Sequence, residues 1–220
     1  MKLSDNTIAI LKNFATINPS ILVRPGSTLS TISPQKSIFA KAPVEETFPR
    51  EFAIYELTKF LGVLSLFNEP EIEFKEKSML IKSGKQQISY TYAEPSMIVS
   101  APEKDITFPE PEIVFNITQE ELQKVVRATG VLQVPDVSIQ GNKEKVRVYA
   151  MNAKNPTTDT FSIDVGETDK HFDMIFKAEN IIKLVPANYN VKISSKGLAL
   201  YTSDKISYYV ATESNSSYQG

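Results

Sequence analysis

The chain has 220 residues, of which 41% are hydrophobic and 23% are charged, so it fits one large or two small folded domains and not a disordered or fibrous chain. It has no cysteine, one histidine and no apolar run long enough for a membrane helix or a signal peptide, which excludes disulfides and thiolate zinc sites and predicts a cytoplasmic protein with no membrane partner. Its 24 basic and 26 acidic residues give a net charge of −2. A chain with this net charge cannot bind nucleic acid through an overall positive charge, unless its basic residues lie together on one surface.

The first half of the chain predicts a capped amphipathic helix, several strands and a second helix. Ser4 has the side chain of a helix N-cap, and Asp5 adds a negative charge in the first turn. Apolar residues then recur at helical spacing and predict a buried stripe, which consists of Ile8, Ile10, Leu11, Phe14 and Ile17. Short β-type runs follow at 21–24, 28–32, 37–41 and 52–55, and a second helix at 57–67.

A proline-spaced segment follows at mid-chain. Residues 93–111 contain four prolines and have no sustained helical or strand period, which is typical of an extended connector. We therefore expect a first domain at 1–95, a connector at 96–111 and a second domain at 112–220.

The second half repeats the order of the first. Thr118 and Glu121 have the spacing of a capping box, and Gly130 predicts the end of that helix. Strand-like runs occupy 134–139, 145–150, 160–165 and 172–176, and a last helix is expected at 178–184, before Pro186. The tripeptide Ile-Ser-Tyr occurs at 88–90 and again at 206–208. These features predict two copies of one α+β unit.

Residues suited to catalysis are few. His171 lies in an alternating, strand-like run, and we expect it to be structural or exposed to solvent. The pairs Glu71/Glu73 and Glu110/Glu112 would need convergent placement to act as acid and base. No glycine-rich phosphate loop or metal-binding motif occurs, and we expect no enzyme activity, no cofactor and no metal.

The expected helices carry basic residues on their outer faces. Lys124 and Arg127 lie opposite Leu122 and Val125, and Lys12 lies away from the apolar stripe of the first helix. One interpretation is an ordinary solvated face with charges that complement the helix dipole. The other is a single basic surface.

Three segments in this order resemble the sliding clamps of tailed bacteriophages, the DNA polymerase processivity factors that are counterparts of proliferating cell nuclear antigen. The segments are 11–18 (LKNFATIN), 60–66 (FLGVLSL) and 208–213 (YYVATE), and the resemblance extends over residues 2–214. It implies an α+β fold of two similar domains, with helices on the inner face and antiparallel sheets outside, in a closed homotrimeric ring. About twelve helices spaced at ~8 to 10 Å leave a lumen on the order of 20 to 28 Å, which tilting would widen enough for duplex DNA.

The resemblance also implies partners and sites. Partners would be encircled duplex DNA, the replicative DNA polymerase, an ATP-dependent clamp loader and two further copies, in the cytoplasm of the infected host. A ring holds DNA by topology, so a mildly positive inner wall suffices despite the net charge of −2. The expected DNA-facing residues are Lys2, Lys12, Lys59, Lys124, Arg127, Lys177 and Lys183.

Two further sets of residues follow from the same resemblance. Partner peptides would enter a pocket between the domains lined by Ile38, Met97, Ile98, Val99, Tyr209, Val210 and Ala211. The alternative for Met97, Ile98 and Val99 is that they only pin the connector to a sheet. Subunits would meet through the edge strands at 86–92 and 158–165, with Tyr90, Tyr92, Phe161 and Ile163 at the interface. The rival functions are a β-rich phage structural or assembly protein that oligomerises without DNA, and a small hydrolase that uses His171 or a carboxylate pair.

Overall fold

The computed structural model describes all 220 residues. The chain divides into two compact units, Met1–Asp105 and Ile106–Gly220, and this division falls within the segment 96–111 expected to be the connector. Apart from a single 3₁₀ turn at Pro95–Met97, no helix or strand lies between Thr91 and Ile113. None of the helices is long and apolar enough to cross a bilayer.

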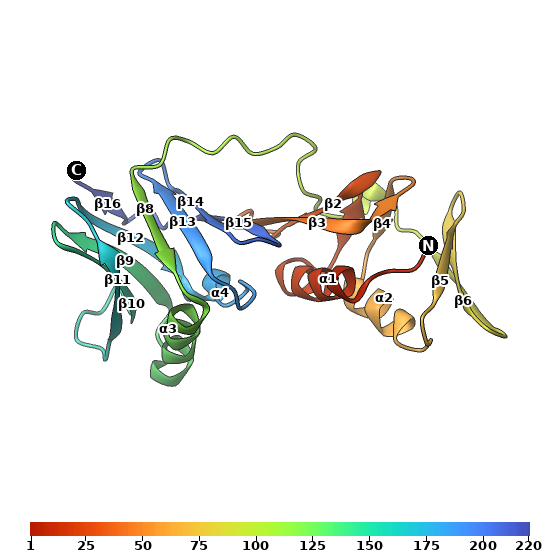
Figure 1. Cartoon of the computed structure of the whole chain (residues 1–220), viewed down its shortest axis with the longest axis horizontal. Coiled ribbons are helices and arrows are strands. Elements are labelled where there is room, and N and C mark those ends of the chain that lie inside the picture. The colour runs from red at the N-terminus through yellow and green to blue at the C-terminus, as the bar shows by residue number, and fades with distance from the viewer. The chain divides into compact units, whose positions relative to one another are not determined.

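Unit 1 contains two helices and seven strands. In chain order they are α1 (Asp5–Ile17), β1 (Ile21–Val23), β2 (Gly26–Ile32), β3 (Ile38–Phe48), β4 (Phe52–Ile54), α2 (Leu57–Leu64), β5 (Glu71–Phe74), β6 (Ser78–Ser83) and β7 (Gln86–Thr91). Strand β1 pairs with β4, β2 with β3, and β5, β6 and β7 form a meander, all antiparallel. Helices α1 and α2 pack against each other (Figure 1) and bury Leu11, Phe14, Leu57 and Phe60.

Unit 2 has the same order with extra strands before and after it. Its elements are β8 (Ile113–Ile117), α3 (Gln119–Leu132), β9 (Asp136–Asn142), β10 (Lys145–Met151), β11 (Phe161–Glu167), β12 (His171–Lys177), α4 (Ala178–Ile181), β13 (Tyr189–Ser194), β14 (Leu198–Thr202), β15 (Ser207–Ala211) and β16 (Ser217–Tyr218). One sheet has the order β11-β10-β9-β12-β16, and α3 packs against its first three strands. The other contains β15, β14, β13 and β8 in antiparallel succession.

Both long helices begin at the capping residues that the sequence indicates. The Ser4 side chain accepts a hydrogen bond from the Thr7 N–H at 3.2 Å, and the Glu46 carboxylate of β3 accepts from the Ser4 N–H and the Thr7 hydroxyl. At α3 the capping box is complete within the helix. The Thr118 hydroxyl accepts from the Glu121 N–H, and the Glu121 carboxylate accepts from the Thr118 N–H at 2.8 Å.

The helix ends differ from the sequence prediction. Gly130 does not end α3, which continues to Leu132 because Gln133 itself takes the left-handed conformation, with φ 53°. Helix α2 ends at Leu64 and not at 67, and α4 ends at Ile181 and not at 184. In both cases the last residues form tighter i→i+3 hydrogen bonds, from Phe67 to Leu64 and from Leu184 to Ile181, so the α-helical segment is shorter.

One position in unit 2 requires a glycine for packing. Gly141 of β9 lies opposite Phe172 of β12, and a Cβ atom at Gly141 would lie 2.3 Å from the Phe172 ring and 2.8 Å from the Lys170 carbonyl oxygen. The aromatic ring therefore occupies the space above the glycine, and β9 and β12 can approach only because that side chain is absent.

Candidate nucleic-acid interface

The helices of both units present basic side chains to solvent. Lys12 on α1 and Lys124 and Arg127 on α3 are exposed, while the opposite faces are buried against the sheets. Lys124 Nζ lies 2.7 Å from the Glu120 carboxylate one turn earlier, an exposed pair of small energetic weight that leaves Lys124 able to exchange partners.

The short helices add one basic residue each. Lys59 on α2 is exposed, with Nζ 4.0 Å from Glu56. Lys183 follows the end of α4 and is half-buried. Together with the long helices, the four helical segments therefore carry five of the seven expected DNA-facing residues.

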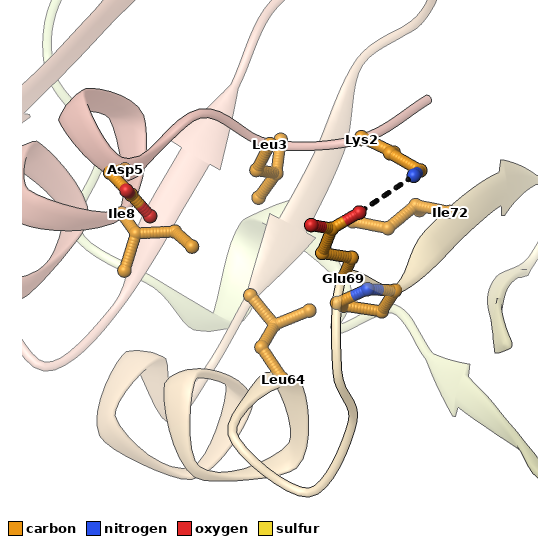
Figure 2. Close-up of a pocket in the computed structure, with 8 residues that line it drawn as sticks. Lys2, Leu3, Asp5, Ile8, Leu64, Glu69 and Ile72 are labelled. Atoms are coloured by element: carbon orange, nitrogen blue, oxygen red, sulfur yellow. Dashed lines mark hydrogen bonds and ion pairs between the residues drawn. The ribbon is translucent and has the colours of Figure 1, made fainter. Parts of the chain in front are cut away.

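Lys2 is one of the residues that line a cavity of about 260 Å³ in unit 1. Figure 2 shows its ammonium group directed at Glu69, and the two charged groups are 3.1 Å apart. The cavity is also lined by apolar side chains, among them Leu3, Leu64 and Ile72. Lys2 thus has a carboxylate partner in its own unit, and this pair is exposed.

Lys177 is the most strongly engaged of the seven. Its Nζ lies 3.1 Å from the Asp136 carboxylate and 3.4 Å from that of Glu213, and the Asp136 side chain is buried. The hydrogen bond with Asp136, aided by the charge of Glu213, raises the pKa of Lys177. This geometry indicates a structural ion cluster where β12 passes into α4, and it makes Lys177 the weakest candidate for contact with phosphate.

Each unit has an edge strand at the place expected for subunit contact. Strand β7 is the edge of the meander in unit 1, and β11 is the edge of the five-stranded sheet in unit 2. Tyr90 on β7 packs on Phe60 of α2 with ring centroids 5.3 Å apart, and Phe161 and Ile163 on β11 are half-buried. Tyr92 lies beyond the end of β7, and its ring stacks on that of Phe52 with ring centroids 5.3 Å apart. The Tyr92 ring therefore packs within unit 1.

The unit 1 residues expected at the partner pocket fall into two classes. Ile38 is buried at the start of β3, whereas Met97 and Val99 have 67% and 40% of their surface exposed and Ile98 is half-buried. The exposure of Met97 and Val99 argues against the alternative that these side chains pin the connector. The connector backbone is instead held by two side chains that sequence reasoning did not select, Asn18 and Arg24.

The unit 2 residues of the same set lie on β15. Val210 is buried, and Tyr209 and Ala211 are half-buried. The Tyr209 ring contacts Phe108, with ring centroids 6.3 Å apart. A pair of half-buried aromatic rings beside a strand suits contact with a small apolar segment.

The groups considered for catalysis do not converge. His171 is exposed on β12, and Glu73 lies 3.8 Å from both Lys75 and Lys82. The Glu112 carboxylate accepts hydrogen bonds from the Ser195 N–H and hydroxyl. No group of three or more His, Asp or Glu side chains is placed to hold a metal ion.

Comparison with known proteins defines the class. The structure is similar to that of the proliferating cellular nuclear antigen of Entamoeba histolytica, with a TM-score of 0.70 and 11% identity over 96% of this chain and 97% of that one. It is also similar to the A. fulgidus PCNA solved with the C-terminal region of FEN-1, with a TM-score of 0.69 and 12% identity over 96% of each chain. The fold is therefore that of the DNA sliding clamps.

The sequence comparison places the chain within this class. Residues 3–100 match the family described as DNA polymerase processivity factor, and residues 114–214 match the C-terminal domain of the gp45 sliding clamp. The sliding clamp of Vibrio phage KVP40 is 33% identical over 97% of this chain and 99% of that protein. The chain belongs to the bacteriophage sliding clamp family.

Membership settles several expectations from the sequence. The resemblance, the α+β fold of two similar units and the role as a non-enzymatic DNA polymerase processivity factor are confirmed. The partners of such a factor are DNA, a DNA polymerase and further copies of the clamp. The rival hypothesis of a small hydrolase is excluded, since sliding clamps are not enzymes.

Proposed function

We propose that three copies of this chain close into a ring around duplex DNA and tether the replicative polymerase, in the cytoplasm of the infected host. The observation that carries this proposal is that each unit has an edge strand that is paired on one side only, β7 in unit 1 and β11 in unit 2. Pairing β7 of one copy with β11 of the next is a head-to-tail contact, and such contacts generate rings when the rotation closes.

DNA contact is assigned to the exposed cations of the helices. Lys12, Lys59, Lys124 and Arg127 are the principal residues, because they are exposed. Lys2, Lys177 and Lys183 have a lesser role, since Lys2 lies before the first residue of α1 and Lys177 and Lys183 are half-buried. Contacts would be made to backbone phosphates without sequence preference, as sliding requires.

Polymerase and the ATP-dependent clamp loader would dock through short apolar peptides. The exposed side chains of Met97 and Val99 in unit 1 and the half-buried Tyr209 and Ala211 in unit 2 support this assignment. The A. fulgidus PCNA, solved with the C-terminal region of FEN-1, is a case in which a clamp of the same fold binds a terminal segment of its partner.

Two measurements test the proposal. The mass in solution should be about three times 24.6 kDa, and a strict monomer at micromolar concentration would contradict the ring. The polymerase of the same phage, with its loader and ATP, should make longer products when this chain is added. The rival assembly protein predicts an oligomer with no change in product length.

A further inference from the structure

The start of the connector is held against unit 1 at its backbone. Asn18 Nδ2 donates to the Val99 carbonyl at 2.9 Å, and Arg24 donates through Nη2 to the Ala101 carbonyl at 2.9 Å. A third contact is the ion pair of Lys41 with Asp105. These contacts become progressively more exposed, because Asn18 is buried, the Arg24 side chain is 25% exposed and the Lys41 side chain is 37% exposed.

Asn18 is the only one of the three that joins two walls of the expected docking region. Its Nδ2 also donates to the Ile32 carbonyl at 2.8 Å, and Ile32 is the last residue of β2, directly before the 33–38 turn. One amide group therefore fixes both the connector at Val99 and the chain that leads into Ile38.

The Asn18 side chain is held in this orientation by its own neighbours. Its Oδ1 accepts hydrogen bonds from the Ser20 N–H at 2.9 Å and the Ser20 hydroxyl at 3.0 Å. All four hydrogen-bonding positions of the amide are thus used. Because only 2% of the Asn18 surface is exposed, removal of the side chain leaves these groups without their direct partners in the protein interior.

The position of Asn18 in the chain links this amide to the helix that carries Lys12. Asn18 is the C-cap of α1, and its N–H donates to the Phe14 carbonyl at 2.9 Å. The connector is therefore attached to the end of a rigid helix and not to a loop, and this fixes its path more firmly.

We propose that Asn18, with Arg24 as a weaker second contact, is a positioning residue that holds the connector in the conformation that partner peptides bind. The inference rests on the proposed docking function. A connector held by its carbonyl groups keeps the Met97 and Val99 side chains directed outward, and a partner that finds this backbone already ordered loses less conformational entropy on binding.

The test compares Asn18→Ala with the wild-type chain in two measurements. Because the chain has no cysteine, a nitroxide on Val99→Cys reports connector mobility without interference, and the labelled protein is used only without partner. The label should tumble several-fold faster in the Asn18→Ala background. In unlabelled protein, the affinity for the purified polymerase of the same phage should fall roughly tenfold, which is ~1.4 kcal/mol.

Two variants separate positioning from a general loss of stability. Thr7→Ala removes a buried side-chain hydrogen bond from the other end of α1, and it should change neither label mobility nor polymerase affinity. Arg24→Gln removes the Ala101 contact without opening a buried site, and it should weaken polymerase binding by roughly threefold. The Arg24→Gln measurement keeps the inference testable if Asn18→Ala does not fold.

The outcomes distinguish this inference from the proposed function. If the wild-type chain does not bind the polymerase, the docking function fails and the inference fails with it. If the wild-type chain binds and Asn18→Ala binds as tightly, or Thr7→Ala weakens binding equally, the docking function stands and the positioning role is rejected. Weaker binding with unchanged connector mobility also rejects it.

Discussion

The starts of α1 and α3 differ in the origin of one carboxylate. Both helices have a hydroxyl N-cap, Ser4 and Thr118, that accepts from the N–H three residues on. At α3 the carboxylate that returns to the cap belongs to Glu121 of the same helix. At α1 the corresponding residue is Thr7, and Glu46 of β3 supplies the carboxylate instead. The first cap is therefore a tertiary contact, and the second is local.

The difference shows how two copies of one unit can keep a helix in place by different means. In unit 1 the cap ties α1 to the sheet, so losing Glu46 affects both the helix and its attachment. In unit 2 the capping box of α3 needs no carboxylate from elsewhere in the chain. The helix is held in place by the buried side chains of Leu122 and Val125 and by the Gln119 N–H, which donates to Asn188 Oδ1 at 2.8 Å.

The largest expected effect is the loss of stability in unit 2 when Gly141 is replaced. Gly141→Ala should lower the free energy of unfolding by about 3 kcal/mol, because the Phe172 ring and the Lys170 carbonyl must both move. Thermal or urea unfolding at fixed chain concentration measures it. The control is Gly130→Ala in α3, where nothing lies within 4 Å of the added Cβ and where a gain of about 0.5 to 1 kcal/mol is expected. Equal effects of the two changes would contradict this packing argument.

Charge reversal on the helices compares the units as DNA-facing surfaces. Lys124→Glu with Arg127→Glu should leave the oligomer intact and shorten its lifetime on circular DNA by roughly tenfold, with a weaker dependence on salt. Lys12→Glu with Lys59→Glu should act in the same direction but less, since these two residues lie on different helices.

A matched pair of exposed lysines in hairpin turns of unit 2, Lys196→Glu with Lys205→Glu, controls for total charge. If that control shortens the lifetime as much as Lys124→Glu with Arg127→Glu does, the effect is one of net charge. The helices would then have no special role in DNA contact.

Removal of the N-cap hydroxyls should affect the two helices unequally. Thr118→Ala should cost about 1 kcal/mol, since its hydroxyl both accepts from the Glu121 N–H and donates to the Glu121 carboxylate. Ser4→Ala should cost about 0.5 kcal/mol, because Glu46 still binds the residue 4 N–H and the Thr7 hydroxyl. The unfolding midpoints of the two variants measure this difference in stability. A larger loss of stability for Ser4→Ala than for Thr118→Ala would contradict the prediction.

The smallest expected effect is the pH dependence that Glu46 contributes. Partial burial opposes ionisation of Glu46, but the hydrogen bonds from Thr7 and Ser4 outweigh it and lower the pKa. A lowered folded-state pKa means that this stabilisation is complete above the ordinary value of 4.5 and is lost as the pH falls through the folded pKa. Glu46→Gln should therefore be less stable than wild type at pH 7, and the difference should shrink below pH 4.5. A difference that is constant with pH would contradict this assignment.

The sequence predicted what depends on neighbours in the chain. The N-caps at Ser4 and Thr118 could be predicted because each bonds a residue three positions away. The predicted end of α3 at Gly130 was wrong. Nothing in the local sequence pattern indicates that the left-handed residue at the end of the helix is Gln133 and not Gly130.

Contacts between distant residues were not predictable in the same way. The Asn18 amide donates to a carbonyl group 81 positions away. Every residue type has a main-chain carbonyl, so the amino acid at position 99 does not indicate this contact. The Lys177 cluster depends on Asp136 and Glu213. Asp136 comes beside Lys177 only once β9 and β12 have paired, and Glu213 lies near it where the Glu213 N–H donates to the Ile175 carbonyl. The assignment to the family required ordered segments of sequence, since no single residue carries it.

The hold on the connector through carbonyl oxygens has an evolutionary consequence. Every amino acid has a main-chain carbonyl, so Asn18 and Arg24 bind the connector whatever side chains it carries at 97, 98 and 99. Substitutions at 97, 98 and 99 can alter which apolar partner segment binds there without detaching the connector from unit 1. A clamp of this design can follow drift in its partners' sequences while its own scaffold stays constant.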